Sequence, residues 1–236
     1  MTRRRRGVGS GPGGSPLTLS IQELFTLHLG EPRAPVVLDT ALRAPYRLEL
    51  VHRYEEPLFT ELTEAVFHAD AASFRWRQLG LVEDEELRAF RRAQLLSKPT
   101  LRIAARHGDE LVGWCFAFSD RPDSVYMASS AVLAEHRRRG LYRAMADAVV
   151  DLARRAGYHA VHSKHIATNN PILLAKLAMG FYIAGTELSA EIGSLVRLEK
   201  PLLEVRERAL LVRSGQRKLT PAMATAITEQ ASVREE

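Results

Sequence analysis

The feature that most constrains this chain is a strand-like segment that runs through three consecutive arginines into a glycine and a helical pattern. The segment reads AVLAEHRRRGLYRAM, residues 131–145, and Arg137–Arg139 directly precede Gly140. Such a sequence requires a fold in which the end of a strand meets the start of a helix through a basic turn. Apolar residues recur at helical spacing beyond the glycine, at Leu141, Met145, Ala148, Val149 and Leu152.

This turn has the ingredients of an anion-binding site. The first backbone N–H groups of a helix have no partner inside the helix, and the helix dipole adds partial positive charge at the same end. Gly140 allows close backbone approach to a ligand, and the arginines add full charges beside it. The turn lacks the Gly-Lys-Ser/Thr of a phosphate loop. It is a candidate phosphate site, with a solvated basic loop and a nucleic-acid patch as alternatives.

The distribution of charge argues against a general nucleic-acid surface. The 236-residue chain has a formal net charge of +5, and Arg3–Arg6 carry most of that excess. No acid lies within residues 1–16, so the rest of the chain is nearly neutral. A nucleic-acid surface needs clustered cations on the folded part. We therefore expect no nucleic-acid partner, and a binder that uses the arginine tail is the remaining alternative of this class.

The composition narrows the class of protein further. Apolar residues make up 46% of the chain and charged residues 26%, as in soluble globular proteins. The single cysteine, Cys115, excludes an internal disulfide and a thiolate metal cluster. No apolar run approaches the ~20 residues of a membrane span, and the basic start lacks the apolar core of a secretory signal. We expect a cytoplasmic protein without membrane contact.

Four parts are predicted along the chain. Residues 1–16, rich in Arg, Gly, Ser and Pro, predict a disordered basic tail. Residues 17–44 predict a lead that packs on the main domain at 45–200, and residues 201–236 a largely helical extension. The tail contains GSGPGG, which fits the dinucleotide pattern G-x-G-x-x-G, but no strand precedes it and no helix follows. The tail therefore predicts no nucleotide site.

The hydrophobic patterns of the main domain predict a mixed α/β fold. The expected order is a strand, two helices, three strands, a helix, a strand, a helix and two strands. This order indicates an antiparallel first half and a later strand–helix–strand crossover. The strands are expected at 46–54, 100–107, 110–118, 124–133, 159–164, 181–185 and 194–200, and the helices at 57–71, 82–97, 141–156 and 170–180.

Two segments together resemble a known family. AVLAEHRRRGLYRAM is similar to the acyl-CoA signature of the GNAT acetyltransferase superfamily, in which Arg/Gln-x-x-Gly-x-Gly/Ala follows a strand and opens a helix; Arg137 and Gly140 match it. The second family element is similar to ATNNPILLAKLAMGF, in which Asn169 stands eleven residues before Gly180. The resemblance implies a central, mostly antiparallel sheet with a splayed parallel pair of strands, flanked by helices.

The resemblance also implies a function. It implies an N-acetyltransferase that moves an acyl group from acetyl-CoA, or another acyl-CoA, directly to the amine of a small molecule or peptide, without a metal. A homodimer is among the assemblies left open. The turn would hold the CoA pyrophosphate, and the strand end would hold the pantetheine arm and the thioester carbonyl. The implied cofactor-binding residues are Ala131, Val132, Leu133, Arg137, Arg138, Arg139, Gly140, Leu141, Tyr142, Arg143, Asn169 and Asn170.

The chain departs from the family pattern at positions that matter for chemistry. Tyr142 stands where relatives usually have Gly or Ala. The expected strand VYMASSAV, 125–132, has no carboxylate, whereas many relatives have a Glu there. Lys176 stands where many relatives have a Tyr. An acyl-CoA-binding regulatory module with weak or lost catalysis is therefore the alternative to an enzyme.

Acyl transfer to an amine needs a base for the amine proton and an acid for the leaving thiolate. His165, near the end of an expected strand, is the candidate base because its ordinary pKa suits proton transfer near neutrality. Lys176 and Tyr182 are the candidates for the acid or for stabilising the thiolate by charge. Structural roles stay open for all three. The candidate acceptor-binding residues, for which packing in the core is the alternative, are Trp76, Trp114, Tyr126 and Ser129.

Overall fold

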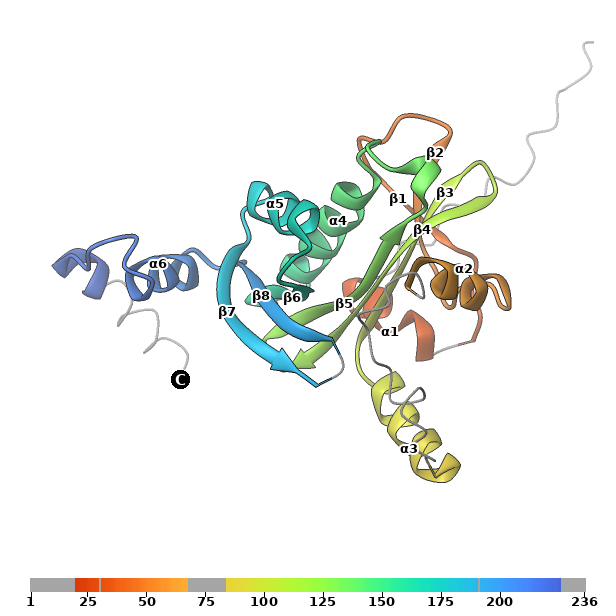
Figure 1. Ribbon diagram of the computed structural model, residues 1–236, viewed down its shortest axis with the longest axis horizontal. Helices are drawn as coiled ribbons and strands as arrows, with labels where there is room; N and C mark the ends of the chain where they lie inside the picture. Colours follow the sequence, from red (N-terminus) through yellow and green to blue (C-terminus); the bar gives the residue numbers. More distant parts are fainter. Residues whose placement is uncertain (1–19, 30, 68–83, 191, 226–236) are drawn as a thin grey trace, which may run out of the picture.

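An eight-stranded sheet organises the protein, in a computed structural model that describes residues 20–29, 31–67, 84–190 and 192–225. The predicted tail at 1–16 and Trp76 lie outside these residues. The sheet has the order β1-β2-β3-β4-β5-β6-β8-β7, and all its neighbours are antiparallel except β5 and β6 (Figure 1). The strands are β1 (Val36–Leu38), β2 (Tyr46–Leu50), β3 (Thr100–His107), β4 (Glu110–Arg121), β5 (Ser124–Val132), β6 (Ala160–Ile166), β7 (Tyr182–Ser189) and β8 (Gly193–Pro201).

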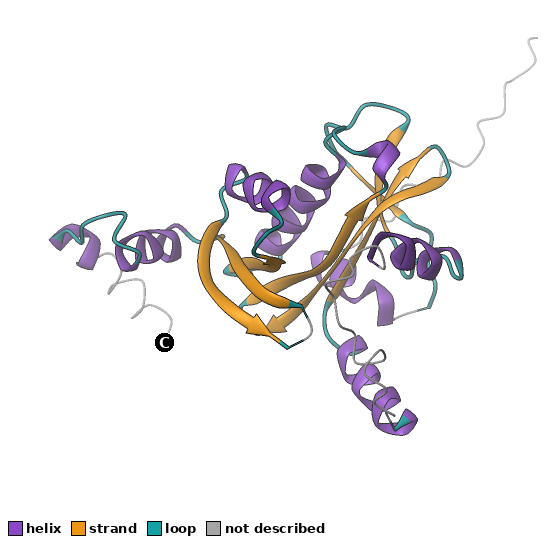
Figure 2. Cartoon of the chain, in the orientation of Figure 1, coloured by secondary structure: helices purple, strands orange, loops and turns teal. Residues whose placement is uncertain are grey.

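Helices flank this sheet on both faces (Figure 2). None of the described helices is long and apolar enough to cross a membrane. The order and pairing of the strands confirm the predicted mixed α/β fold with one parallel pair of strands. The helices are α1 (Ile21–Thr26), α2 (Leu58–Phe67), α3 (Glu85–Leu96), α4 (Leu141–Arg155), α5 (Asn170–Ala178) and α6 (Glu204–Arg213), with short 3-10 turns at Leu27–Leu29 and Ala134–His136.

The parallel pair is splayed. β5 and β6 pair only from Ser124 opposite Ala160 to Met127 opposite Ser163, and both strands continue beyond the last pair. Directly after Met127, the register between β4 and β5 shifts, so that Ala128 is an extra residue between two paired positions. A bulge of this kind bends its strand. The bend turns β5 away from β6 and opens a gap, which we call the splay, between residues 128–132 and 164–166.

Two hydrophobic clusters define the two faces of the sheet. The larger cluster joins α1 and α4 to one face, and Ile103, Cys115 and Val125 belong to it. The smaller cluster lies on the other face, where Phe59 and Leu62 of α2 pack against the fully buried Trp114. Because neighbouring residues of a strand point to opposite faces, β4 contributes to both clusters.

Close contact between β4 and β5 depends on Gly113. A Cβ atom at this position would lie 2.8 Å from the backbone oxygen of Ala131, and backbone cannot move away easily. The glycine therefore allows β4 to lie close to the last residues of β5, which precede the basic turn and adjoin the splay.

Two differences from the sequence prediction have clear physical reasons. The first predicted strand ends at Leu50 rather than at residue 54, because Tyr54 turns inward, stacks on Phe59 at 4.2 Å between centroids and donates a hydrogen bond to the carbonyl of Cys115 at 2.8 Å. Strand β1 was not predicted, because three residues are too short for a visible alternation. Its existence depends on pairing with β2.

Candidate active site

The basic turn has an unusual backbone. Arg138 and Gly140 both adopt left-handed conformations, with φ of 61° and 83°. The first bond into α4 runs from the Ala144 N–H to the Gly140 carbonyl at 2.9 Å, so the three preceding amides have no acceptor inside the helix. Left-handed residues beside such free N–H groups form a concave site for anions. The geometry therefore suits a pyrophosphate.

The arginines of the run have different roles. Arg137 turns back, and its Nε donates a hydrogen bond to the Val132 carbonyl at 3.0 Å, which ties the turn to the end of β5. Arg139 lies over the Tyr46 ring, 5.8 Å from its centroid. Arg143, on the first turn of α4, forms an ion pair with Asp147 at 3.5 Å. The side chains of Arg137 and Arg139 thus fix the turn, and the backbone supplies its free donors.

The end of β5 directs backbone groups into the splay. Leu133 N–H donates to the Val112 carbonyl of β4 at 2.9 Å. Backbone groups alternate in direction along an antiparallel strand, so those of Val132 point to the opposite edge. That edge is the splay, because β6 has already diverged from β5 there. The Val132 carbonyl is held by Arg137, and its N–H is directed toward any group that enters the splay.

A buried lysine lies beside the splay. Lys176, on α5, is completely buried. Its Nζ donates a hydrogen bond to Met127 Sδ at 3.0 Å and lies 4.0 Å from the centroid of the Phe181 ring. Burial lowers the pKa of Lys176 to about 7. This side chain therefore gains or loses its proton near neutrality, at the last residue pair before the strands diverge.

His165 lies on β6, two residues beyond that last pair. Its Nε2 is 3.0 Å from the hydroxyl of Ser163, a fully buried serine. Burial, and secondarily the nearby charge of Lys176, lower the pKa of His165 to about 4. The imidazole is therefore neutral over the physiological range of pH.

Tyr142 does not extend over the turn. Its ring packs against the main core and lies 5.8 Å from Lys176 Nζ. Burial raises the pKa of its phenol, which stays protonated. The bulky ring of Tyr142 thus contributes to the wall around Lys176.

Cys115 behaves as a core residue. It is completely buried, and burial raises the pKa of its thiol. The Ser130 hydroxyl donates a hydrogen bond to its Sγ at 3.2 Å. A protonated, buried thiol is a poor nucleophile, so Cys115 is suited to packing in the core.

The other candidate residues are dispersed. Tyr182 lies on β7, with β8 between it and β6, and its hydroxyl donates to Glu207 at 2.7 Å. Trp114 is fully buried, and its Nε1 donates to Ser129 Oγ at 3.2 Å on the face that α2 covers. Tyr126 stacks on His162 with centroids 5.0 Å apart. Asn169 and Asn170 begin α5, and Ala131 belongs to the smaller hydrophobic cluster.

Sequence reasoning assigned no role to two polar residues on the face opposite Lys176, His162 and Arg102. His162 is buried, its Nε2 lies 2.9 Å from an Asp120 oxygen, and its Nδ1 has no partner in the described part of the chain. Arg102 lies on β3. The available signal was a polar residue next to apolar strand residues, because Leu101 and Ile103 flank Arg102 and Val161 precedes His162. Within the described residues, no three His, Cys, Asp or Glu side chains form a metal-binding group.

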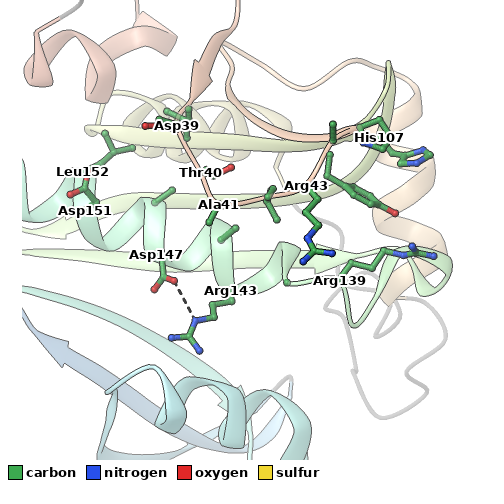
Figure 3. Close-up of a pocket in the computed structure, with 18 of the residues that line it drawn as sticks. Asp39, Thr40, Ala41, Arg43, His107, Arg139, Arg143, Asp147, Asp151 and Leu152 are labelled. Atoms are coloured by element: carbon green, nitrogen blue, oxygen red, sulfur yellow. Dashed lines mark ion pairs between the residues drawn. The ribbon is translucent and has the colours of Figure 1, made fainter.

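A cavity of about 1060 Å³ adjoins the turn (Figure 3). It runs along α4, between the segment at 38–46 and the helix residues Arg143, Asp147 and Asp151, and it meets the turn at Arg139 and Gly140. Neither His165 nor Lys176 lines it. The cavity is thus continuous with the proposed anion site and distinct from the splay.

A family model described as "Acetyltransferase (GNAT) family" matches residues 63–181, just over half of the chain. No curated protein matches the sequence. Among solved structures, the yncA protein of Salmonella typhimurium, solved with its cofactor acetyl-CoA, is 19% identical, with 67% of this chain and 95% of that chain covered and a TM-score of 0.49.

Two further structures have similar scores. The ribosomal-protein-S18-alanine N-acetyltransferase of Escherichia coli is 15% identical, with 66% and 94% of the two chains covered and a TM-score of 0.46. An N-acetyltransferase of Staphylococcus aureus Mu50 is 17% identical, with 68% and 100% covered and a TM-score of 0.48. At these low identities, the assignment rests on the family model. The chain belongs to the GNAT acetyltransferase family.

Proposed function

We propose that this protein is an acetyl-CoA-dependent N-acetyltransferase that moves the acyl group directly from CoA to an amine acceptor. The observation that carries this proposal is the turn at 137–143, where two left-handed residues and the free amides of a helix start adjoin the splayed end of β5. Membership of an acetyltransferase family makes acyl-CoA the appropriate anionic ligand.

The chain's own groups account for binding. The amides of Leu141, Tyr142 and Arg143 would hold the pyrophosphate, because they are free and lie at the positive end of the helix dipole. The Val132 N–H, directed into the splay, would donate to the thioester end of the substrate. A fixed donor at a carbonyl that gains negative charge is worth about 3 kcal/mol in comparable acyl-transfer sites.

The residues beside the splay supply the proton transfers. The acceptor nitrogen attacks the thioester carbon, a C–N bond forms and the C–S bond breaks. The proton that the nitrogen loses passes to the neutral imidazole of His165, directly or through Ser163. The ammonium of Lys176 stabilises the leaving thiolate by its positive charge and finally gives it a proton. Tyr182 has no part in this scheme, because its hydroxyl contacts Glu207.

The test is to mix the purified protein with acetyl-CoA and a panel of amines and to follow the release of free thiol. We expect thiol release that depends on both substrates. The alternative, an acyl-CoA-binding module without catalysis, predicts that acetyl-CoA raises the melting temperature by mass action while no amine releases thiol. That combination of results would overturn the proposed function.

A further inference from the structure

Among the described residues, the helices that cover the sheet decide from which face an acceptor can reach the splay. Helices α4 and α5 lie over the sheet face to which Met127 belongs, and Lys176 of α5 contacts Met127 there (Figure 1). Given the described residues, an acceptor would therefore approach from the opposite face, and its amine would enter the splay to reach the thioester and His165. On that face α2 covers the positions of Ala104, Trp114 and Ala131, and the adjacent row of the sheet consists of Arg102, Phe116 and Ser129 in paired register.

Arg102 is the unusual member of this row. Its guanidinium lies over the Phe116 ring, with Cζ 5.4 Å from the centroid. Its Nη1 is buried and has no hydrogen-bond acceptor in the described part of the chain. No carboxylate of the described residues forms an ion pair with it. Burial lowers the pKa of Arg102, but a guanidinium keeps its charge in proteins.

No anionic side chain of the described residues lies beside Arg102. The ionisable group that interacts with it is the Tyr54 hydroxyl, and burial raises the pKa of this phenol well above its usual value. Tyr54 therefore stays neutral, and its hydroxyl is used by the Cys115 carbonyl. A partly buried charge that has no partner among the described residues is costly in a folded protein, so the carboxylate of a ligand is a suitable partner for Arg102.

Several other charged groups on this face are compensated by described residues of the chain. Arg106, the next arginine along β3, contacts Glu49 at 2.9 Å. Asp120 is bound by His162 at 2.9 Å, as described above. Further ion pairs that involve residues of this face include Lys164 with Glu187 at 2.8 Å, Arg197 with Glu199 at 2.7 Å and Arg206 with Glu199 at 3.2 Å.

The surroundings of the guanidinium are aromatic. The rings of Phe116 and Phe118 are 5.7 Å apart, and those of Phe118 and Tyr126 are 5.6 Å apart. This row runs from beneath the guanidinium to β5, whose paired segment ends at Met127. Neighbouring strands lie about 4.8 Å apart, so a charge placed over β4 is about one strand spacing from β5, whose far edge faces the splay. An acceptor of amino-acid size can span that distance.

We propose that Arg102 binds the carboxylate of the acceptor, and that the acceptor is an amino acid with an apolar or aromatic side chain. The carboxylate lies at the guanidinium, the side chain lies along Phe116 and Phe118, and the amine reaches the splay. A bidentate guanidinium–carboxylate contact also fixes orientation. This inference rests on the proposed function, because it names the acceptor of the same reaction.

The experiment compares L-phenylalanine and L-leucine with their amides, L-phenylalaninamide and L-leucinamide, in the thiol-release assay. The variants are Arg102→Met, which keeps much of the side-chain volume, and Arg106→Met, the control on the same strand. We expect kcat/KM of the wild type to favour the acids over the amides by tenfold or more, as is usual for a charge-assisted contact, about 1.5–3 kcal/mol. Arg102→Met should abolish this preference, and Arg106→Met should retain it.

The outcomes separate the two proposals. Turnover of amines with no preference for the acid, unchanged by Arg102→Met, overturns this inference and leaves the proposed function intact. If no amine releases thiol, the proposed function fails. The role of Arg102 in carboxylate binding is then tested by ligand binding alone. N-acetyl-L-phenylalanine should then raise the melting temperature of the wild type in the presence of CoA but not that of Arg102→Met. An equal shift in both proteins, or no shift in either, overturns the inference.

Discussion

At the scale of single residues, Lys176 is the clearest departure from ordinary protein chemistry. Its pKa falls from 10.5 to about 7 because it is buried. Between these two values the unfolded chain binds more protons than the folded one, so this residue makes stability rise with pH from 7 to 10.5. Below pH 7 both states hold the proton, and the full cost of burying the charge is present.

We therefore expect Lys176→Met to raise the melting temperature most at pH 6 and by less as the pH approaches 10. Thermal denaturation of both proteins at pH 6, 8 and 10 measures the difference. Lys218→Met, at an exposed position, is the control and should show no trend. If the difference in melting temperature between wild type and Lys176→Met does not change with pH, then burial does not lower the pKa of Lys176.

The same residue determines the expected pH dependence of activity. If the ammonium of Lys176 compensates the thiolate, turnover should fall as the pH rises through about 7. Lys176→Arg retains its charge above that pH, so the fall in turnover should move to higher pH. Lys176→Met should lose about 10²–10⁴-fold in kcat. Profiles of kcat against pH, with CoA-induced thermal shifts as a check on binding, test this. A descending limb that Lys176→Arg leaves in place would contradict the assignment.

At the scale of elements, the turn between β5 and α4 carries the binding argument. Gly140 has φ of 83°, and a Cβ added there would meet nothing within 4 Å. Gly108, in the turn between β3 and β4, has φ of 60° and is equally open. Alanine at either site is strained by its conformation alone, by about 1–2 kcal/mol.

This equivalence provides a matched pair of variants. Gly140→Ala and Gly108→Ala should destabilise the protein by similar amounts in chemical denaturation. Only Gly140→Ala should weaken CoA binding, because only its turn presents the free amides of α4. Isothermal titration with CoA measures the affinities. Equal loss of affinity in both variants would mean that the turn does not hold the ligand.

At the scale of the whole molecule, local patterns predicted the elements and long-range packing determined the chemistry. The hairpin of β3 and β4, the turn and α4 were visible in the sequence because periodicity and glycine positions are local properties. The titration range of Lys176 and the neutrality of His165 were not, because burial depends on how α5 packs beside the splayed strands. Tyr182, a candidate by sequence position, lies on β7 beyond β8 for the same reason.

The sequence by itself determined that a strand, a basic turn and a helix meet at Gly140, and that a second strand–helix unit follows at family spacing. Only the tertiary structure decided which side chains surround the splay and which charges lack a partner. Arg102 and Lys176 are separated by 74 positions in the chain and lie on opposite faces of one sheet. Desolvation and pairing arise from contacts between distant segments, and no local pattern encodes them.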